Sequence, residues 1–249
     1  MLVIIDAVSN IGSVRKQNED MALVQGEFIR DSKLQLYIEP TSYMPIVVAV
    51  ADGIGGHNGG ELASELAISS LDEFVHLFPS GLTDKALQNK FNVWVKEIHQ
   101  SIVQKGIDIP EFYNMGTTLV GILIYDNRIF WFNVGDSRLY RVRDKIITQI
   151  SSDHSARKMM NPNAPSNLIC NSIGAGEACF IDFYPMNTVF DDDTYILCSD
   201  GLNDMISDDE IDQIIIEQGS AQDLVDAAIK AGGNDNVTVV TLSFLNVGR

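Results

Sequence analysis

Aspartate residues recur where an apolar run of the sequence ends or begins, beside glycine or asparagine. Asp52, Asp136 and Asp200 each follow such a run, and Asp235 stands just before the last one. A single aspartate in this setting is usually a turn residue that hydrogen-bonds to its own backbone. Four such settings favour a shared chemical role, because strand ends on one side of a sheet converge.

Converging carboxylates are costly to bury, and bound cations would offset their mutual repulsion. The sequence has no H-E-x-x-H motif and no cysteine pair at C-x-x-C spacing, so the candidate ligands are oxygen atoms. Oxygen ligands suit Mg²⁺ or Mn²⁺ rather than structural zinc. Two such ions about 3.5–4 Å apart commonly activate water for phosphoryl displacement. Gly53 would let a backbone carbonyl approach an ion beside Asp52.

A turn-rich segment near the start brings a cation close to two acids. Arg15 precedes Glu19 and Asp20 by only a few residues. The planar arginine fork matches a phosphate dianion. Most arginines are simply surface charges, and the nearness of the two acids is what favours a phosphate contact here.

Short β-branched runs predict the strands that would position these residues. The runs cover residues 45–51, 119–125, 128–134, 138–143, 194–199 and 237–244. Turn residues at 126–127 and 144–145 indicate antiparallel neighbours, and we expect a meander of strands there.

Helical periodicity marks two long segments, 61–78 and 83–105, with Thr83 placed as an N-cap. Two shorter helices are expected at 211–217 and 221–230. The first follows a capping-box pattern from Ser207 to Glu210, and Ser220 opens the second. Helices placed between and after strands predict stacked antiparallel sheets flanked by helices.

The composition bounds the class of protein. The chain has 249 residues, 45% of them apolar and 20% charged, which fits one folded domain without internal repeats. A net charge of −17 argues against nucleic acid and anionic lipid as partners. We expect no signal peptide and no membrane span, since the longest apolar stretch, 46–51, is too short. Three cysteines without paired spacing suit a reducing cytoplasm.

Seven short motifs occur in a fixed order along the whole chain. They are Gly12-x-x-Arg15-x-x-Asn18-Glu19-Asp20, Asp52-Gly53-x-Gly55-Gly56-His57, Gly116-Thr117-Thr118, Gly135-Asp136-Ser137-Arg138, Asp153-His154-Ser155, Ser199-Asp200-Gly201-Leu202 and Asp235-Asn236-Val237-Thr238. Each motif alone is weak, but the ordered set resembles the metal-dependent protein phosphatases of type 2C, and their bacterial branch in particular. The resemblance implies a four-layer α/β/β/α sandwich of the α+β class, with residues 1–249 as a single catalytic domain.

The resemblance also implies roles for the acids. Asp52 would bridge two ions, Asp200 and Asp235 would complete the first, and Glu19 with the carbonyl of Gly53 would serve the second. These ions would be Mn²⁺ or Mg²⁺.

Three further roles follow from the same resemblance. Asp136, together with Asp200, would hold a third and weaker ion. Asp20 would orient the attacking water from behind the ligands, and Arg15 would grip the substrate phosphate. The expected substrate is a phosphoserine or phosphothreonine protein, and the expected biological role is to oppose a bacterial serine/threonine kinase.

Two departures from the family pattern bear on mechanism and selectivity. Ile54 stands where some members have a histidine proposed as the proton donor, and His57 is expected to stabilise its loop instead. The stretch 156–173, which in bacterial relatives forms a flap, is shorter than usual. Substrate selection and binding of the third ion are the properties that this change would affect.

Two other interpretations of the same residues are possible. A P-loop nucleotide-binding enzyme is rejected, because no Gly-Lys-Ser/Thr follows the glycine-rich stretch 53–60. A catalytically weak pseudophosphatase that binds phosphoproteins remains the alternative, although every expected acid is present.

Overall fold

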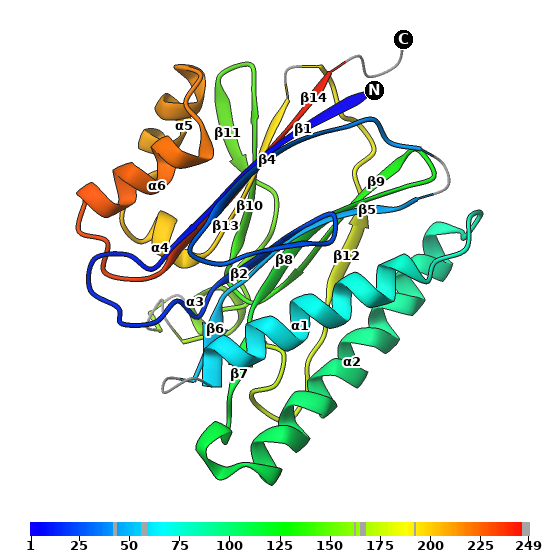
Figure 1. Ribbon diagram of the computed structural model, residues 1–249, viewed down its shortest axis with the longest axis vertical. Coiled ribbons are helices and arrows are strands. Elements are labelled where there is room, and N and C mark those ends of the chain that lie inside the picture. The colour runs from blue at the N-terminus through cyan, green and yellow to red at the C-terminus, as the bar shows by residue number, and fades with distance from the viewer. Residues whose placement is uncertain (42–43, 56–58, 162, 165–167, 192, 246–249) are drawn as a thin grey trace.

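Two six-stranded antiparallel sheets stack face to face, and helices cover both outer faces (Figure 1). The structure is a computed structural model that describes residues 1–41, 44–55, 59–161, 163–164, 168–191 and 193–245. The first sheet has the strand order β11 (Ile146–Gln149), β10 (Arg138–Arg143), β13 (Thr194–Cys198), β14 (Val237–Leu245), β1 (Leu2–Asn10) and β4 (Lys33–Ile38). The second has the order β12 (Asp182–Pro185), β9 (Arg128–Val134), β8 (Leu119–Tyr125), β5 (Ile46–Ala51), β2 (Met21–Val24) and β3 (Glu27–Ile29).

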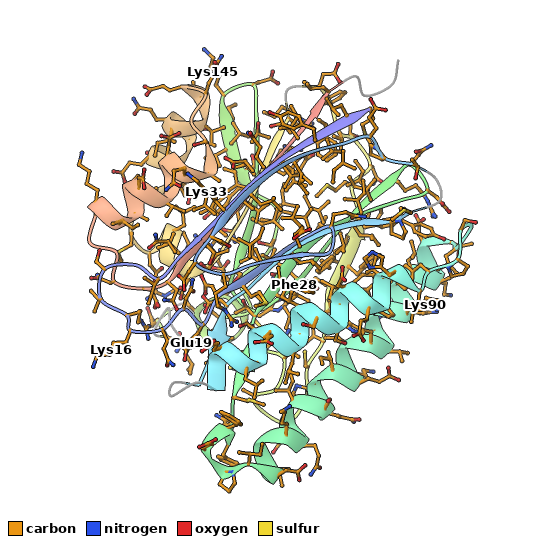
Figure 2. The ribbon with its side chains drawn as sticks, viewed as in Figure 1. Lys16, Glu19, Phe28, Lys33, Lys90 and Lys145 are labelled. Atoms are coloured by element: carbon orange, nitrogen blue, oxygen red, sulfur yellow. The ribbon has the colours of Figure 1, made fainter. Side chains whose placement is uncertain are left out.

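The helices divide between the two outer faces, as Figures 1 and 2 show. The long helices α1 (Gly59–His76) and α2 (Asp84–Asp108) lie on the second sheet, and a 3₁₀ turn, η1 (Pro110–Phe112), follows α2. The helices α4 (Asp200–Asn203), α5 (Asp208–Ile216) and α6 (Ala221–Lys230) lie on the first sheet. A short helix α3 (Ala156–Met159) and the small pair β6 (Gly53–Ile54) and β7 (Gly116–Thr117) complete the fold.

Three apolar layers hold these four layers of structure together. Phe91 and Trp94 of α2 pack with the outer face of the second sheet. Val3 and Leu197 belong to the layer between the sheets. Leu224 of α6 belongs to the layer under the first sheet. The predicted α/β/β/α sandwich is therefore confirmed.

The predicted helices are present, with small shifts at their ends. Thr83 accepts a hydrogen bond from the backbone N–H of Ala86 at 3.2 Å, which confirms it as the N-cap of α2. Capping boxes open α5 from Ser207 and α6 from Ser220. α1 begins two residues before the predicted start, at Gly59, and ends at His76.

The expected meander is wrong, because β9 and β10 belong to different sheets. The chain crosses between the sheets at Gly135, where φ is +101°. A Cβ atom there would lie 2.7 Å from Cγ2 of Thr118, so the crossing requires glycine. The hairpins on either side are as predicted: the turn residues Asp126 and Asn127, like Asp144 and Lys145, have positive φ.

Six described strands of the two large sheets, and the small pair β6 and β7, were not predicted, and β1 shows one reason. Asp6 interrupts its apolar run, but the Asp6 carboxylate accepts a hydrogen bond from the backbone N–H of Ala221 at 3.0 Å. The polar residue thus serves the start of α6 without breaking the strand.

No described helix is both long and apolar enough to cross a lipid bilayer.

Candidate metal centre

Asp52 lies where β5 ends, and two threonines of the β7–β8 region fix its backbone. The backbone N–H of Asp52 donates to Oγ1 of Thr118 at 3.0 Å. The carbonyl of Asp52 accepts from Oγ1 of Thr117 at 2.9 Å and from the backbone N–H of Thr118 at 2.9 Å. The Gly116-Thr117-Thr118 motif is therefore the support for Asp52.

Gly53 lies at a close crossing of three segments. Its N–H donates to the carbonyl of Glu19 at 3.2 Å. A Cβ atom on Gly53 would lie 2.2 Å from the carbonyl oxygen of Gly60 and 2.6 Å from that of Glu19. Only glycine allows β6, the start of α1 and the Glu19 loop to meet in this way.

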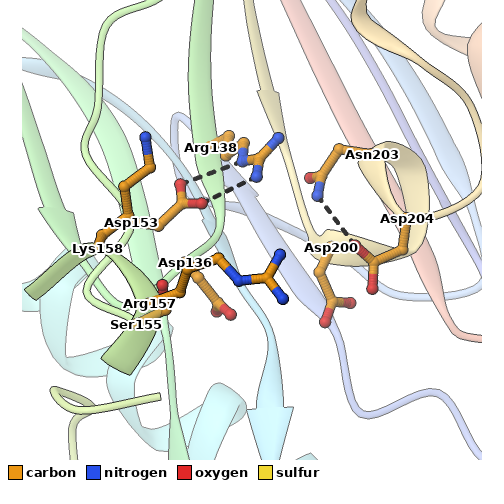
Figure 3. Close-up of a pocket in the computed structure, with 9 residues that line it drawn as sticks. All are labelled: Asp136, Arg138, Asp153, Ser155, Arg157, Lys158, Asp200, Asn203 and Asp204. Carbon is orange, nitrogen blue, oxygen red and sulfur yellow. Dashed lines mark hydrogen bonds and ion pairs between the residues drawn. The ribbon is translucent and has the colours of Figure 1, made fainter. Parts of the chain in front are cut away.

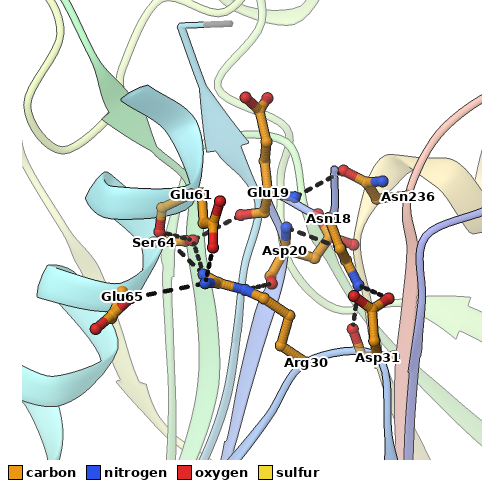
Figure 4. Close-up of polar contacts among 10 residues, drawn as sticks. Asn18, Glu19, Asp20, Arg30, Asp31, Glu61, Ser64, Glu65 and Asn236 are labelled. Atoms are coloured by element: carbon orange, nitrogen blue, oxygen red, sulfur yellow. Dashed lines mark hydrogen bonds and ion pairs between the residues drawn. The ribbon is translucent and has the colours of Figure 1, made fainter. Parts of the chain in front are cut away.

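Arg30 ties the Glu19–Asp20 backbone to α1 (Figure 4). Its Nε donates to the carbonyl of Asp20 at 2.9 Å, and its Nη1 donates to Oε1 of Glu61 at 3.1 Å. Ser64 accepts from Nη2 of Arg30 at 3.0 Å and donates to the carbonyl of Glu19 at 2.6 Å. The sequence reasoning did not find Arg30, because it lies outside the seven motifs.

Two asparagines hold the same loop from its other side (Figure 4). Oδ1 of Asn236 accepts from the backbone N–H of Glu19 at 2.9 Å, and its Nδ2 donates to the carbonyls of Ile11 and Gln17. Oδ1 of buried Asn18 accepts from the backbone N–H of Asp20 at 3.1 Å. With its backbone fixed, the Glu19 carboxylate points away from the polar contacts drawn around it.

Asp20 is buried and receives a hydrogen bond from Oγ of Ser199 at 2.7 Å. Burial raises the pKa of Asp20 to about 7, with repulsion from Asp200 and Asp235 adding to the effect. Hydrogen bonds from Ser199 and Thr238 oppose this rise. An acid with such a pKa can hold or release a proton near neutral pH.

The acids at the strand ends raise one another's pKa. Burial, followed by repulsion from Asp200, Asp20 and Asp136, raises the pKa of Asp52 well above its usual range. Burial and repulsion from Asp235 raise the pKa of Asp200 to about 6, while a hydrogen bond with Asp52 opposes that rise. These residues, separated by up to 215 positions in the sequence, are thus brought within electrostatic range of each other.

Arg15 supplies positive charge at the edge of this cluster. Its Nη2 lies 2.6 Å from Oδ2 of Asp235, and its side chain is 49% exposed. That hydrogen bond and the charges of Asp235, Glu19 and Asp200 raise the pKa of the guanidinium, against the effect of burial. Arg15 therefore faces the acids while staying accessible to a ligand.

Asp136 and Asp200 line a cavity of about 260 Å³ beside the cluster (Figure 3). Burial and repulsion from Asp200 raise the pKa of Asp136 to about 7. Arg157 and Lys158 of α3 line the same cavity. The cavity therefore combines two acids of the cluster with cations from the segment 156–173.

The Asp153-His154-Ser155 motif supports the loop that carries Asp136. Arg138 donates to both carboxylate oxygens of Asp153, from Nε at 3.1 Å and from Nη2 at 2.9 Å. Nδ1 of His154 accepts from the backbone N–H of Gly135 at 3.1 Å. The His154 backbone N–H donates to the Gly135 carbonyl at 2.9 Å. This histidine is therefore a positioning residue.

The donor set fits divalent cations in its chemistry. Buried or half-buried carboxylates repel one another, and the glycine crossing at Gly53 leaves its backbone close to Asp52 and Glu19. As the side chains stand, no three acidic, His or Cys side chains of the described residues meet as ligands of one ion. The individual ligand roles therefore stay predictions. Ile54 lies in β6 opposite Gly116, and His57 lies outside the described residues.

Comparison with known proteins identifies the family. The protein phosphatase 2C profile matches residues 20–228. This chain belongs to the protein phosphatase 2C family. A relative from Listeria monocytogenes, the serine/threonine phosphatase stp, is 30% identical over 246 residues, which covers 92% of this chain and 91% of the relative.

Solved structures of phosphatase 2C members have the same fold. The Mycobacterium tuberculosis serine/threonine phosphatase PstP/Ppp superposes with a TM-score of 0.77 at 30% identity, over 98% of this chain and 99% of that one. The catalytic domain of PstP in complex with two manganese ions superposes with a TM-score of 0.73 at 30% identity, with the same coverage of both chains.

Proposed function

We propose that this chain is a metal-dependent phosphatase that hydrolyses phosphoserine and phosphothreonine esters in proteins. The observation that carries the proposal is the group of carboxylates at converging strand ends, whose pKa values burial and mutual repulsion raise, with Arg15 beside them. The phosphatase 2C family match and the names of the Listeria and mycobacterial relatives support it.

The residues that would hold two ions are Asp52, Asp200, Asp235, Glu19 and Gly53, the last through its backbone carbonyl. The relative solved with two manganese ions supports Mn²⁺ or Mg²⁺ as the cofactor. When bound, such ions supply Lewis-acid chemistry and lower the pKa of water so that it attacks phosphorus near neutral pH.

The protein's own groups divide the remaining work between binding and proton handling. Arg15 would bind the phosphate dianion with its planar donors, and its exposure beside Asp235 supports this role. Asp20 would accept a hydrogen bond from the attacking water, and its burial and its hydrogen bond from Ser199 support this role. In the reaction, water forms the new P–O bond and gives up a proton, the bond from phosphorus to the serine or threonine oxygen breaks, and that oxygen takes up a proton.

A third ion site between Asp136 and Asp200 is also proposed. Both side chains line the same cavity, and the charge of Asp200 adds to the effect of burial in raising the pKa of Asp136. Arg157 and Lys158 line that cavity too, which supports a role of the segment 156–173 in substrate contact. Opposition to a serine/threonine kinase in the cytoplasm is the biological role that we propose.

The test compares turnover with and without metal. We expect the purified protein to hydrolyse p-nitrophenyl phosphate and a phosphothreonine peptide with Mn²⁺, and to lose both activities in excess EDTA. Asp200→Asn should abolish both activities while circular dichroism shows a folded protein. Full activity in excess chelator would contradict the proposal. A folded wild-type protein that binds phosphopeptide without turnover would favour the pseudophosphatase alternative.

A further inference from the structure

A second cavity is lined by residues of both sheets, and it shares no lining residue with the cavity at the acid cluster. Strands β9, β10 and β13 and the segment after β12 line it, and Figure 1 shows these elements. Its volume is about 290 Å³. None of its described lining residues is acidic, in a chain whose net charge is −17, and two of them are Arg141 and Arg143.

Arg143 is already neutralised. It donates to Asp193 from Nε and from Nη2, at 2.6 Å in each case, and its guanidinium lies 4.5 Å from the ring centre of Phe190. This bidentate pair lowers the pKa of Asp193, against the effect of burial. Arg143 therefore forms a fixed wall of the cavity and adds little free charge.

Arg141, two residues earlier on the same face of β10, is different. Its Nε is buried and has no hydrogen-bond partner among the described residues. A buried donor without a partner carries a desolvation cost that an anionic acceptor would remove. The cavity thus contains a half-buried cation whose hydrogen-bonding capacity is not used by the described residues.

The other lining residues favour a ligand in which an apolar group is attached to the anionic group. Trp131, Ile150 and Met186 line the cavity, and the Trp131 ring lies 5.2 Å from that of Tyr184. The hydroxyl of Tyr195, also at the cavity, already donates to Oδ2 of Asp193 at 3.3 Å, so it is not a free donor for the ligand. A volume of about 290 Å³ limits the ligand to a small molecule.

We propose that this cavity binds a small organic anion, with a carboxylate or a phosphorus oxyanion on Arg141 and an apolar group against Trp131. The guanidinium fork matches both kinds of oxyanion. The proposal does not depend on the phosphatase activity, because no residue assigned to the metal centre lines this cavity.

The indole N–H signals of the two tryptophans provide the readout, since the chain contains only Trp94 and Trp131. ¹⁵N-labelled protein is titrated separately with benzoate and with phenylphosphonate, and Trp94→Phe assigns the two signals. We expect saturable shifts of the Trp131 signal and a steady Trp94 signal. A response to benzoate alone would identify a carboxylate site, and a response to phenylphosphonate alone a phosphorus oxyanion site.

The variants test the role of the cation. Arg141→Gln should weaken binding by about tenfold to a hundredfold, as expected for loss of a charge-assisted hydrogen bond. Arg141→Lys, which keeps the charge without the planar fork, should bind with intermediate affinity. Lys145→Gln removes a charge from the turn of the same hairpin and should leave binding unchanged.

Three results would overturn the proposal. They are no shift of the Trp131 signal with either anion, an equal shift with uncharged benzyl alcohol, and undiminished binding by Arg141→Gln.

Discussion

Arg15 and Asp235 interact closely, although 220 positions separate them in the sequence. Because Arg15 is held by an acid of the cluster yet 49% exposed, it can meet a substrate phosphate without a large rearrangement. We predict that Arg15→Ala mainly raises KM, since the contact would exist in both the ground state and the transition state. The expected loss in kcat/KM is roughly tenfold to a hundredfold, from a charge-assisted hydrogen bond.

Steady-state kinetics with a phosphopeptide at saturating Mn²⁺ measure this effect. Lys16→Ala is the matched control, because the neighbouring Lys16 is exposed and its substitution removes the same charge. Equal effects of the two substitutions would return Arg15 to the role of an ordinary surface charge.

Asp136 allows a second prediction for a single residue. If an ion between Asp136 and Asp200 helps to protonate the leaving group, a serine alkoxide should depend on it, whereas p-nitrophenolate, a weak base, should not. Asp136→Ala should therefore depress phosphopeptide hydrolysis far more than p-nitrophenyl phosphate hydrolysis. Asp204→Asn removes a charge from the same cavity and should affect both substrates alike. Equal losses for Asp136→Ala would refute the proton-donor role.

Elements differed in how far the sequence predicted them. Helices α5 and α6 carry their own start signals in Ser207 and Ser220, so both were found with nearly correct bounds. The edge strand β4 alternates half-buried and exposed residues, and its pattern lacks a strong apolar run. Assignment of β9 and β10 to separate sheets depends on the crossing at Gly135, which no local periodicity records.

The candidate site likewise divides into residues marked by local sequence and residues whose role depends on the tertiary fold. Acids next to strand ends were predictable, because Asp-Gly and Asp-Ser pairs mark a loop after an apolar run. Arg30 was not, since its function comes from the meeting of the Glu19 loop with α1 in space. The contact of Asp235 with Arg15 likewise appears only once the two ends of the chain are side by side.

Arg30 carries the prediction at the scale of elements. Arg30→Met would keep much of the side-chain volume but release the Glu19–Asp20 backbone from α1. We expect the Mn²⁺ concentration for half-maximal activity to rise about tenfold or more, as for loss of other groups that orient metal ligands. Glu65→Gln is the control. Oε2 of Glu65 lies 3.7 Å from Nη1 of Arg30, and the Glu65 side chain is 55% exposed, against 16% for Arg30. An unchanged Mn²⁺ requirement in Arg30→Met would show that the hydrogen bonds of Arg30 are not needed for metal binding.

At the scale of the whole molecule, the four-layer sandwich brings the loop after the first strand and the loop before the last strand to one charged site. β1 and β14 pair along their full lengths, so the loops at residues 11–20 and 231–236 leave the sheet together. The fold thereby places acids from distant motifs close together, and its stability should depend on whether those acids are protonated or neutralised by cations. The net charge of −17 adds a diffuse repulsion of the same sign.

Asp200 makes that dependence measurable in chelated protein. Burial and Asp235 raise its folded-state pKa to about 6, above its ordinary value of 3.8. A raised pKa means that the folded state holds the proton more tightly, so stability is lost as pH rises from about 4 through about 6.

Asp200→Asn avoids this loss and can still accept the hydrogen bond from Asp52. In EDTA at pH 7.5 the variant should exceed the wild type in free energy of unfolding by an amount on the order of 1 kcal/mol, and the difference should vanish near pH 4. Saturating Mn²⁺ should reverse the order, because the wild type alone would gain fully from binding. Thermal unfolding across pH, with exposed Asp226→Asn as the control, decides the matter: a variant less stable than the wild type in EDTA at pH 7.5 would show that Asp200 is not under electrostatic strain.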